Sequence, residues 1–157
     1  MSSAQSTPQP EVHEYQAEMQ KLLDILVHSL YTEREIFLRE LLSNSADALS
    51  KVQFLALTSA DQLLNPDASL QIELSFDEEK QTITIEDTGC GMTREELIEN
   101  LGTIASSGTL KFLREAQQSK QAVQNLIGQF GVGFYAVFMV ADKVELTTRS
   151  WRPHSQA

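Results

Sequence analysis

The sequence predicts an α+β fold, a two-layer sandwich in which helices lie beside antiparallel strands. Two observations lead to this prediction. Apolar residues recur every three or four positions at the start of the chain, and they then alternate strictly over the two short runs 70–76 and 82–86. The predicted elements follow the order helix, helix, hairpin, glycine loop, helices, glycine loop, helix, strand, so the helices are grouped around the strands.

Length and composition fit one folded domain. The chain has 157 residues, of which 41% are hydrophobic and 22% charged, enough apolar material for a packed core. The formal net charge of −10 disfavours a nucleic-acid-binding surface. No apolar run is long enough to cross a membrane, and the single cysteine, Cys90, favours a reducing compartment. We therefore expect a cytoplasmic protein with neither a nucleic-acid nor a membrane partner.

The first part of the chain predicts a tail and two helices. Residues 1–12 are small, polar and proline-containing, so we expect a disordered tail there and a folded region over 13–157. Apolar spacing predicts helices over about 12–30 and about 32–57. Thr32 and Glu35 have the spacing of a capping box at the start of the second helix.

The period of the pattern then changes to two. After a connection with a short helical piece, LQIELSF and TITIE predict two strands joined by the polar turn DEEKQ. Leu70, Ile72, Leu74 and Phe76 share one face of the first strand, and the second strand repeats this pattern with isoleucines at 83 and 85. The sequence thus predicts a hairpin with one apolar face.

Short elements follow the hairpin. A helix is predicted over about 94–101, where Thr93 and Glu96 form another capping box. The polar stretch KFLREAQQSKQ is also helical in pattern. An apolar helix near 132–139 should be buried, because it is apolar nearly all round. The last element is a strand, KVELTTR, over 143–149.

The glycines are unevenly distributed, since all seven lie between Gly89 and Gly133. Each could be an ordinary turn or helix end. The whole cluster favours a system of loops that faces a ligand, because glycine lets the backbone approach a bound group closely.

A polar stripe runs along the second predicted helix. With 100° per residue, Glu40, Asn44, Asp47 and Lys51 fall within about 60° of one another, opposite an apolar arc. A solvated face with an Asp47–Lys51 ion pair would explain this. The functional alternative is a shared pocket in which Asn44 holds a metal or phosphate oxygen and Glu40 orients a water.

Two glycine motifs accompany the stripe. In IEDTGCGM a strand delivers Asp87 to a loop, where its carboxylate either accepts a hydrogen bond from an amino group, such as that of a base, or bonds its own backbone in a turn. In GQFGVGF the glycines open a helix, an arrangement that suits phosphate but that a tightly packed helix entry would also explain. The chain contains no Walker A motif.

Taken together, FLRELLSNSADAL, IEDTGCGM, NLGTIASSGT and IGQFGVGFYAVFMVADKV resemble the ATP-binding N-terminal domain of Hsp90-family chaperones, over about residues 13–149. This domain has the Bergerat, or GHKL, ATPase fold, shared with gyrase B, MutL and sensor histidine kinases. The resemblance implies helices on a mixed, mostly antiparallel sheet and a chaperone that uses ATP and Mg²⁺ on unfolded or partly folded client proteins. A histidine kinase or topoisomerase part is disfavoured, because no dimerisation helix with a phospho-acceptor histidine is present.

The resemblance also implies residue roles. Glu40 matches the general base, Asn44 the Mg²⁺ ligand and Asp87 the acid that bonds the adenine amino group. Residues 102–128 match a mobile lid. The ATP-binding set implied in this way is Asn44, Asp47, Ala48, Asp87, Gly91, Met92, Asn100, Leu101, Gly128, Gln129, Phe130, Gly131, Val132, Gly133 and Phe134.

The chain departs from the family pattern in places. Ser45 and Ala46 stand in swapped order, Ser106 replaces a frequent lysine, and Ala136 a frequent serine. The family domain continues with more strands, and a middle domain that supplies a catalytic arginine and a dimerising domain follow. We therefore expect a partial domain that lacks its last strands and is monomeric, although the full-length family forms homodimers. The alternative to an ATPase is a non-hydrolysing remnant that binds only partners or nucleotide.

Overall fold

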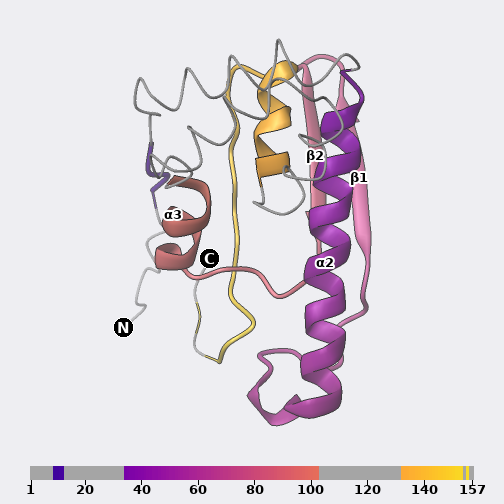
Figure 1. Ribbon diagram of the computed structural model, residues 1–157, viewed down its shortest axis with the longest axis vertical. Helices are drawn as coiled ribbons and strands as arrows, with labels where there is room; N and C mark the ends of the chain where they lie inside the picture. The colour runs from indigo at the N-terminus through magenta and orange to yellow at the C-terminus, as the bar shows by residue number, and fades with distance from the viewer. Residues whose placement is uncertain (1–8, 13–33, 103–131, 154, 156–157) are drawn as a thin grey trace, which may run out of the picture.

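The computed structural model describes residues 9–12, 34–102, 132–153 and 155, with helices beside a β-hairpin (Figure 1). Residues 1–8 of the predicted tail, nearly all of the first helix, the polar helical stretch and nearly all of the lid lie outside the described residues. The α+β class is confirmed. The described elements are α2 (Ile36–Thr58), η2 (Ala60–Gln62), β1 (Ile72–Asp77), β2 (Thr82–Asp87), α3 (Arg94–Gly102) and η3 (Val132–Met139).

Helix α2 is the long element against which η2, η3 and the two strands pack. It ends where the backbone N–H of Ser59 donates to the carbonyl of Leu55 at 2.7 Å. Its N-cap, Glu35, makes no side-chain capping bond, and the proposed partner Thr32 lies outside the described residues. Ser45 is buried because it falls at about +140° from Glu40, in the middle of the apolar arc.

The predicted hairpin is confirmed. Strands β1 and β2 pair antiparallel, with Leu74 opposite Ile85 and Phe76 opposite Ile83. The turn over 78–81 places Gln81 at φ 54°. The apolar side chains near the turn stay exposed, and the exposed fraction of Phe76 is 74%. Helix α2 therefore covers only part of this face.

The best-buried apolar residues lie on η3, which packs on α2. Tyr135 and Ala136 are fully buried and Val137 nearly so, which confirms that this segment is internal. It is a 3₁₀-helix. The hydrophobic pattern could not distinguish this form from an α-helix, because the segment is short and apolar on every side.

The predicted strand over 143–149 is wrong. This segment is extended but joins no sheet in the described part of the chain. It runs along the long axis of the molecule between α3 and α2 (Figure 1). Its end instead meets the loop after β2, where the N–H of Trp151 donates to the carbonyl of Cys90 at 2.8 Å. Alternation in the sequence therefore predicted an extended backbone correctly, but not the partner of that backbone.

Helix α3 begins with the predicted capping box. The N–H of Thr93 donates to Oε2 of Glu96 at 2.9 Å, and the N–H of Glu96 donates to the hydroxyl of Thr93 at 3.2 Å. Arg94 forms an ion pair with Glu11 at 2.8 Å, which ties the described N-terminal piece to this helix. None of the helices in the described part of the chain has the length and hydropathy that a bilayer crossing requires.

Candidate functional site

The polar stripe lies on α2 as the spacing predicted. Asn44 and Asp47 are exposed, and Glu40 is half-buried. Within the described residues, Asp47 and Lys51 do not form the ion pair that their spacing allows. The carboxylate of Glu40 and the amide of Asn44 are thus presented one helical turn apart on the same face.

Gly133, at the start of η3, packs against this stripe. A Cβ at residue 133 would overlap the carboxylate of Glu40. The end of the second glycine motif is therefore in contact with the acid that the sequence singled out. Val132 and Phe134 flank this glycine on η3, and Gly128, Gln129, Phe130 and Gly131 lie outside the described residues.

The loop after β2 packs on α2 two turns further along. A Cβ on Gly89 would overlap the side chain of Ala48, and the N–H of Cys90 donates to the carbonyl of Ala48 at 3.2 Å. Asp87 is half-buried, and its Oδ1 accepts from the N–H of Gly89 at 2.9 Å. One oxygen of Asp87 thus forms the local turn, whereas no hydrogen bond to its Oδ2 occurs among the described residues.

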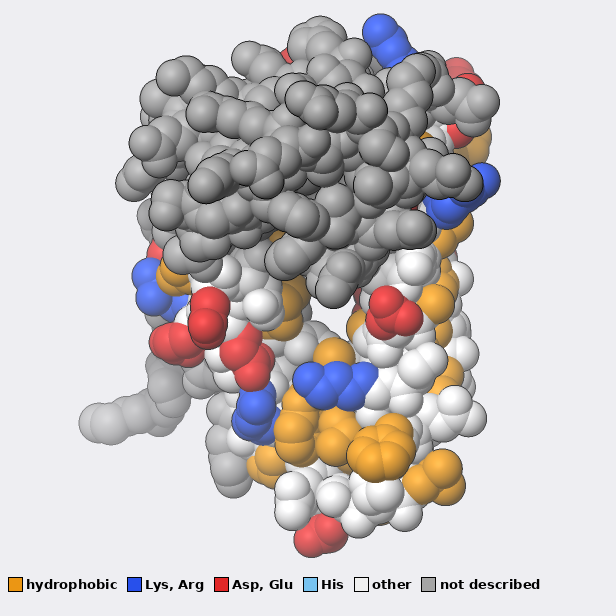
Figure 2. All heavy atoms as spheres, viewed as in Figure 1, with side chains coloured by type: hydrophobic (Ala, Val, Ile, Leu, Met, Phe, Trp, Pro, Cys, Tyr) orange, Lys and Arg blue, Asp and Glu red, His pale blue; other side chains and the backbone are white. Residues whose placement is uncertain are grey.

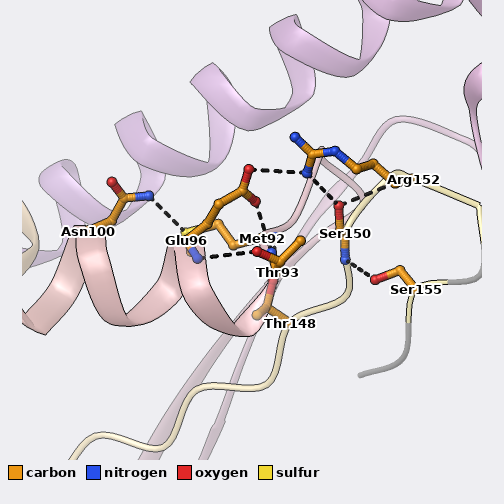
Figure 3. A network of polar contacts seen from close by, with 8 residues as sticks. All are labelled: Met92, Thr93, Glu96, Asn100, Thr148, Ser150, Arg152 and Ser155. Carbon is orange, nitrogen blue, oxygen red and sulfur yellow. Dashed lines mark hydrogen bonds and ion pairs between the residues drawn. The ribbon is translucent and has the colours of Figure 1, made fainter.

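Gly91 and Met92 continue this loop toward α3. Gly91 has a φ of +57°, a left-handed conformation that glycine adopts at little cost. The side-chain amide of Asn100 lies 3.7 Å from the sulfur of Met92, a weak contact visible in Figure 3. The hydroxyl of Tyr135 donates to the carbonyl of Leu101 at 2.5 Å, which joins the end of α3 to η3.

These contacts assemble the described site residues around one region. Glu40, Asn44 and Ala48 lie on α2, and the 87–92 loop contacts α2 at Ala48. Helix α3 and η3, which are joined through Leu101 and Tyr135, lie on the other sides of this region. In Figure 2 this face of the molecule is hollowed between its α3 side and its α2 side, with acidic side chains on both borders. In the described residues, no cluster of three or more His, Cys, Asp or Glu side chains suits a metal ion.

Two titratable groups at the rim have shifted pKa values. Burial raises the pKa of the Cys90 thiol, although the nearby Lys51 ammonium opposes this shift. The pKa of Glu96 is lowered, chiefly because its carboxylate accepts a hydrogen bond from the backbone N–H of Thr93, and also because it pairs with Arg152. Cys90 is therefore a neutral thiol and Glu96 an anion near pH 7.

Sequence reasoning missed the residues that hold the 87–92 loop from its other side. Thr148 accepts a hydrogen bond from the N–H of Met92 at 3.0 Å, and Arg152 lies 3.1 Å from Glu96 (Figure 3). No local signal marks these residues, because each partner is more than fifty positions away in the sequence.

The sequence of this chain matches a known class of ATPase domain. Residues 31–156 match the family described as histidine kinase-, DNA gyrase B-, and HSP90-like ATPase, and the chain belongs to this family.

Curated relatives narrow this class to the Hsp90 branch. The chaperone protein HtpG of Chlorobium phaeobacteroides is 60% identical over 145 residues, covering 92% of this chain and 23% of the relative. The HtpG of Chlorobium luteolum is 55% identical over 157 residues, covering 99% of this chain and 25% of the relative. The resemblance to Hsp90-family chaperones is thereby confirmed. The chain spans about a quarter of the length of these relatives.

Proposed function

We propose that this chain binds Mg²⁺·ATP against the Glu40–Asn44 face of α2 and hydrolyses it slowly, as the ATPase part of an Hsp90-family chaperone. In this proposal Asp87 receives the adenine amino group, Asn44 faces the phosphates and Glu40 polarises the attacking water. Met92, Asn100 and Leu101 border the nucleotide, and the glycine motif that ends at Phe134 supplies backbone N–H groups to the phosphates.

One observation carries this proposal, namely that both glycine segments pack on the same helix. Gly133 lies against Glu40 and Gly89 against Ala48. These two positions on α2 are separated by about 12 Å along the helix axis. An elongated ligand with a base at one end and a polyphosphate at the other fits this spacing, because Asp87 stands near Ala48 and Glu40 lies at the other position.

The residues present also fit a magnesium ion. Mg²⁺ prefers oxygen ligands and is usually held by one or two protein groups together with phosphate oxygens and water. Asn44 is exposed on the stripe and offers one amide oxygen beside Glu40 and Asp47. When bound there, Mg²⁺ would neutralise phosphate charge, which phosphoryl transfer requires in a protein of net charge −10.

The carboxylate of Glu40 suits the role of a base. It is half-buried against Gly133, so the adjoining backbone restricts its position. Phosphoryl transfer depends mainly on positioning and charge stabilisation. A carboxylate held near the attacking water contributes to the positioning of that water.

Binding is tested by titration calorimetry with Mg²⁺ and ATP. Asp87→Asn should abolish binding, because an amide in place of the carboxylate removes the charged acceptor for the amino group. Glu86→Gln is the matched control, since Glu86 is an exposed neighbour on β2. Equal affinity in wild type and Asp87→Asn would refute the assignment of the base site.

Hydrolysis is tested separately by phosphate release. Glu40→Ala should keep ATP binding and lose turnover by a factor on the order of 10²–10⁴, the usual contribution of a general base. Wild-type protein that binds ATP without releasing phosphate would instead favour the non-hydrolysing alternative.

The relatives also suggest further functions for the protein. We propose that it acts in the cytoplasm on unfolded or partly folded client proteins and as a homodimer. The support for this is the identity to HtpG chaperones over nearly all of this chain.

A further inference from the structure

We propose that Thr148 is a positioning residue for base recognition, because its hydroxyl fixes the backbone of Met92 in the loop that carries Asp87. This inference rests on the proposed function. It goes further in assigning a role to a residue outside the implied binding set, on a segment far from that loop in the sequence.

The first step is the hydrogen bond itself. The N–H of Met92 donates to the hydroxyl oxygen of Thr148 at 3.0 Å, and both residues are half-buried. The N–H of Met92 has no backbone acceptor among the described residues, so without this hydroxyl its bonding capacity would depend on water reaching a partly buried site.

The second step is that the segment around Thr148 is itself held firmly. The N–H of Trp151 donates to the carbonyl of Cys90 at 2.8 Å, and the carbonyl of Trp151 accepts from the N–H of Leu64 at the same distance. Gly91 packs so closely on the carbonyl of Arg149 that a Cβ would overlap it. Loop and segment therefore touch at three successive positions of the loop, namely Cys90, Gly91 and Met92.

The third step is an ion pair between the start of α3 and the segment that carries Thr148. Glu96 accepts from Thr93 through Oε2 and pairs through Oε1 with Arg152 at 3.1 Å. The guanidinium of Arg152 also donates to the hydroxyl of Ser150 at 3.2 Å, and Figure 3 shows these groups forming one chain of contacts from α3 to the segment. The start of α3 and residues 148–152 thus hold the loop from both sides.

These contacts matter for the base because they hold the Met92 end of the loop, whereas α2 and β2 hold the end that carries Asp87. Asp87 is placed by the end of β2 and by its bond to Gly89, whereas Met92 lies five residues later, beside Asn100. Releasing the N–H of Met92 would loosen the border of the base site while leaving Glu40 and Asn44 in place. Discrimination between bases should therefore change more than turnover of bound nucleotide.

The test compares Thr148→Val with wild type by calorimetry, using ADP and GDP. Valine keeps the shape of threonine and lacks the acceptor. We expect ADP affinity to fall about three- to tenfold, the equivalent of one lost hydrogen bond, and the preference for ADP over GDP to fall with it. Thr148→Ser, which keeps the hydroxyl, should restore both values, and Thr147→Val on the exposed neighbour should change neither.

The outcomes separate this inference from the proposed function. If wild type binds ADP and Thr148→Val binds it with equal affinity and equal base preference, the inference is wrong and the proposed function stands. A lowered melting temperature with unchanged affinity of the folded protein would also overturn it, since the role would then be structural only. If wild type binds no adenine nucleotide, both proposals fall.

A second measurement covers the case in which Thr148→Val does not fold. Hydrogen exchange at the Met92 amide in nucleotide-free wild type should be slow, because that N–H is already bonded. Exchange as fast as in an open loop, with protection only after ADP is added, would overturn the inference.

Discussion

Gly133 lies directly against the carboxylate of Glu40, and no side chain fits between them. The space around residue 133 is limited by the carboxylate end of the flexible Glu40 side chain. The glycine therefore leaves room for the proposed base, and the two residues should be coupled energetically.

Gly133→Ala tests this coupling. The new methyl group should displace the Glu40 carboxylate and cost about 1 kcal/mol of unfolding free energy, with a loss of ATP turnover. In the Glu40→Ala background the same substitution should cost less, because the overlapping atoms are gone. Urea denaturation of wild type, the two single variants and the double variant gives the coupling energy. Strictly additive effects would show that the new methyl group and the Glu40 side chain do not compete for this space.

Gly89→Ala should be more harmful. The added Cβ would overlap the side chain of Ala48 and approach Oδ1 of Asp87 to 2.7 Å, so the loop must move away from α2. We expect the free energy of unfolding to fall by about 1–3 kcal/mol and ADP binding to weaken. Adding Ala48→Gly removes one of the overlapping groups, so the double variant should bind ADP more tightly than Gly89→Ala alone. Calorimetry of both variants checks this order.

Gly91→Ala should be the worst of the three glycine variants. Its φ of +57° disfavours any side chain, and the atom in the way is the backbone carbonyl of Arg149, which cannot rotate aside. We expect the free energy of unfolding to fall by about 2–4 kcal/mol, which would lower the melting temperature. A melting temperature above that of Gly133→Ala would contradict the close contact of the two backbones.

Glu96 should make stability depend on pH. Its pKa in the folded protein is lowered from 4.5, first by the hydrogen bond from the Thr93 backbone and then by Arg152. The ionised form is favoured by folding, so this stabilisation is present above pH 4.5 and is lost as the pH falls through the lower folded-state pKa.

Glu96→Gln isolates the charge, because glutamine keeps an oxygen that can cap the helix. At pH 7 it should cost at most about 1 kcal/mol, since the ion pair is partly exposed. The difference from wild type should be smaller at a pH below the lowered folded-state pKa, where Glu96 is protonated. Urea denaturation at both pH values checks this, with Glu95→Gln as the control on the exposed neighbour. A difference that stays constant with pH would rule out the charge as its source.

Local patterns predicted the elements well where one short stretch of chain determines the outcome. The shared apolar face of the hairpin follows from alternation of apolar residues, and Leu74 and Ile85 on that face are paired across the two strands. The capping box of Thr93 and Glu96 forms because its two partners are three residues apart. The strand predicted over 143–149 is wrong because strand formation also needs a partner edge, and alternation does not specify one.

The sequence by itself determined which residues share the stripe on α2 and which segments turn on glycine, because helical periodicity and glycine's missing side chain are local properties. Only the tertiary structure decided that Gly133 meets Glu40, that Gly89 meets Ala48 and that Thr148 meets Met92. Such contacts join positions far apart in the chain and depend on how α2, η3 and the extended segment pack. No periodicity in the sequence records that packing.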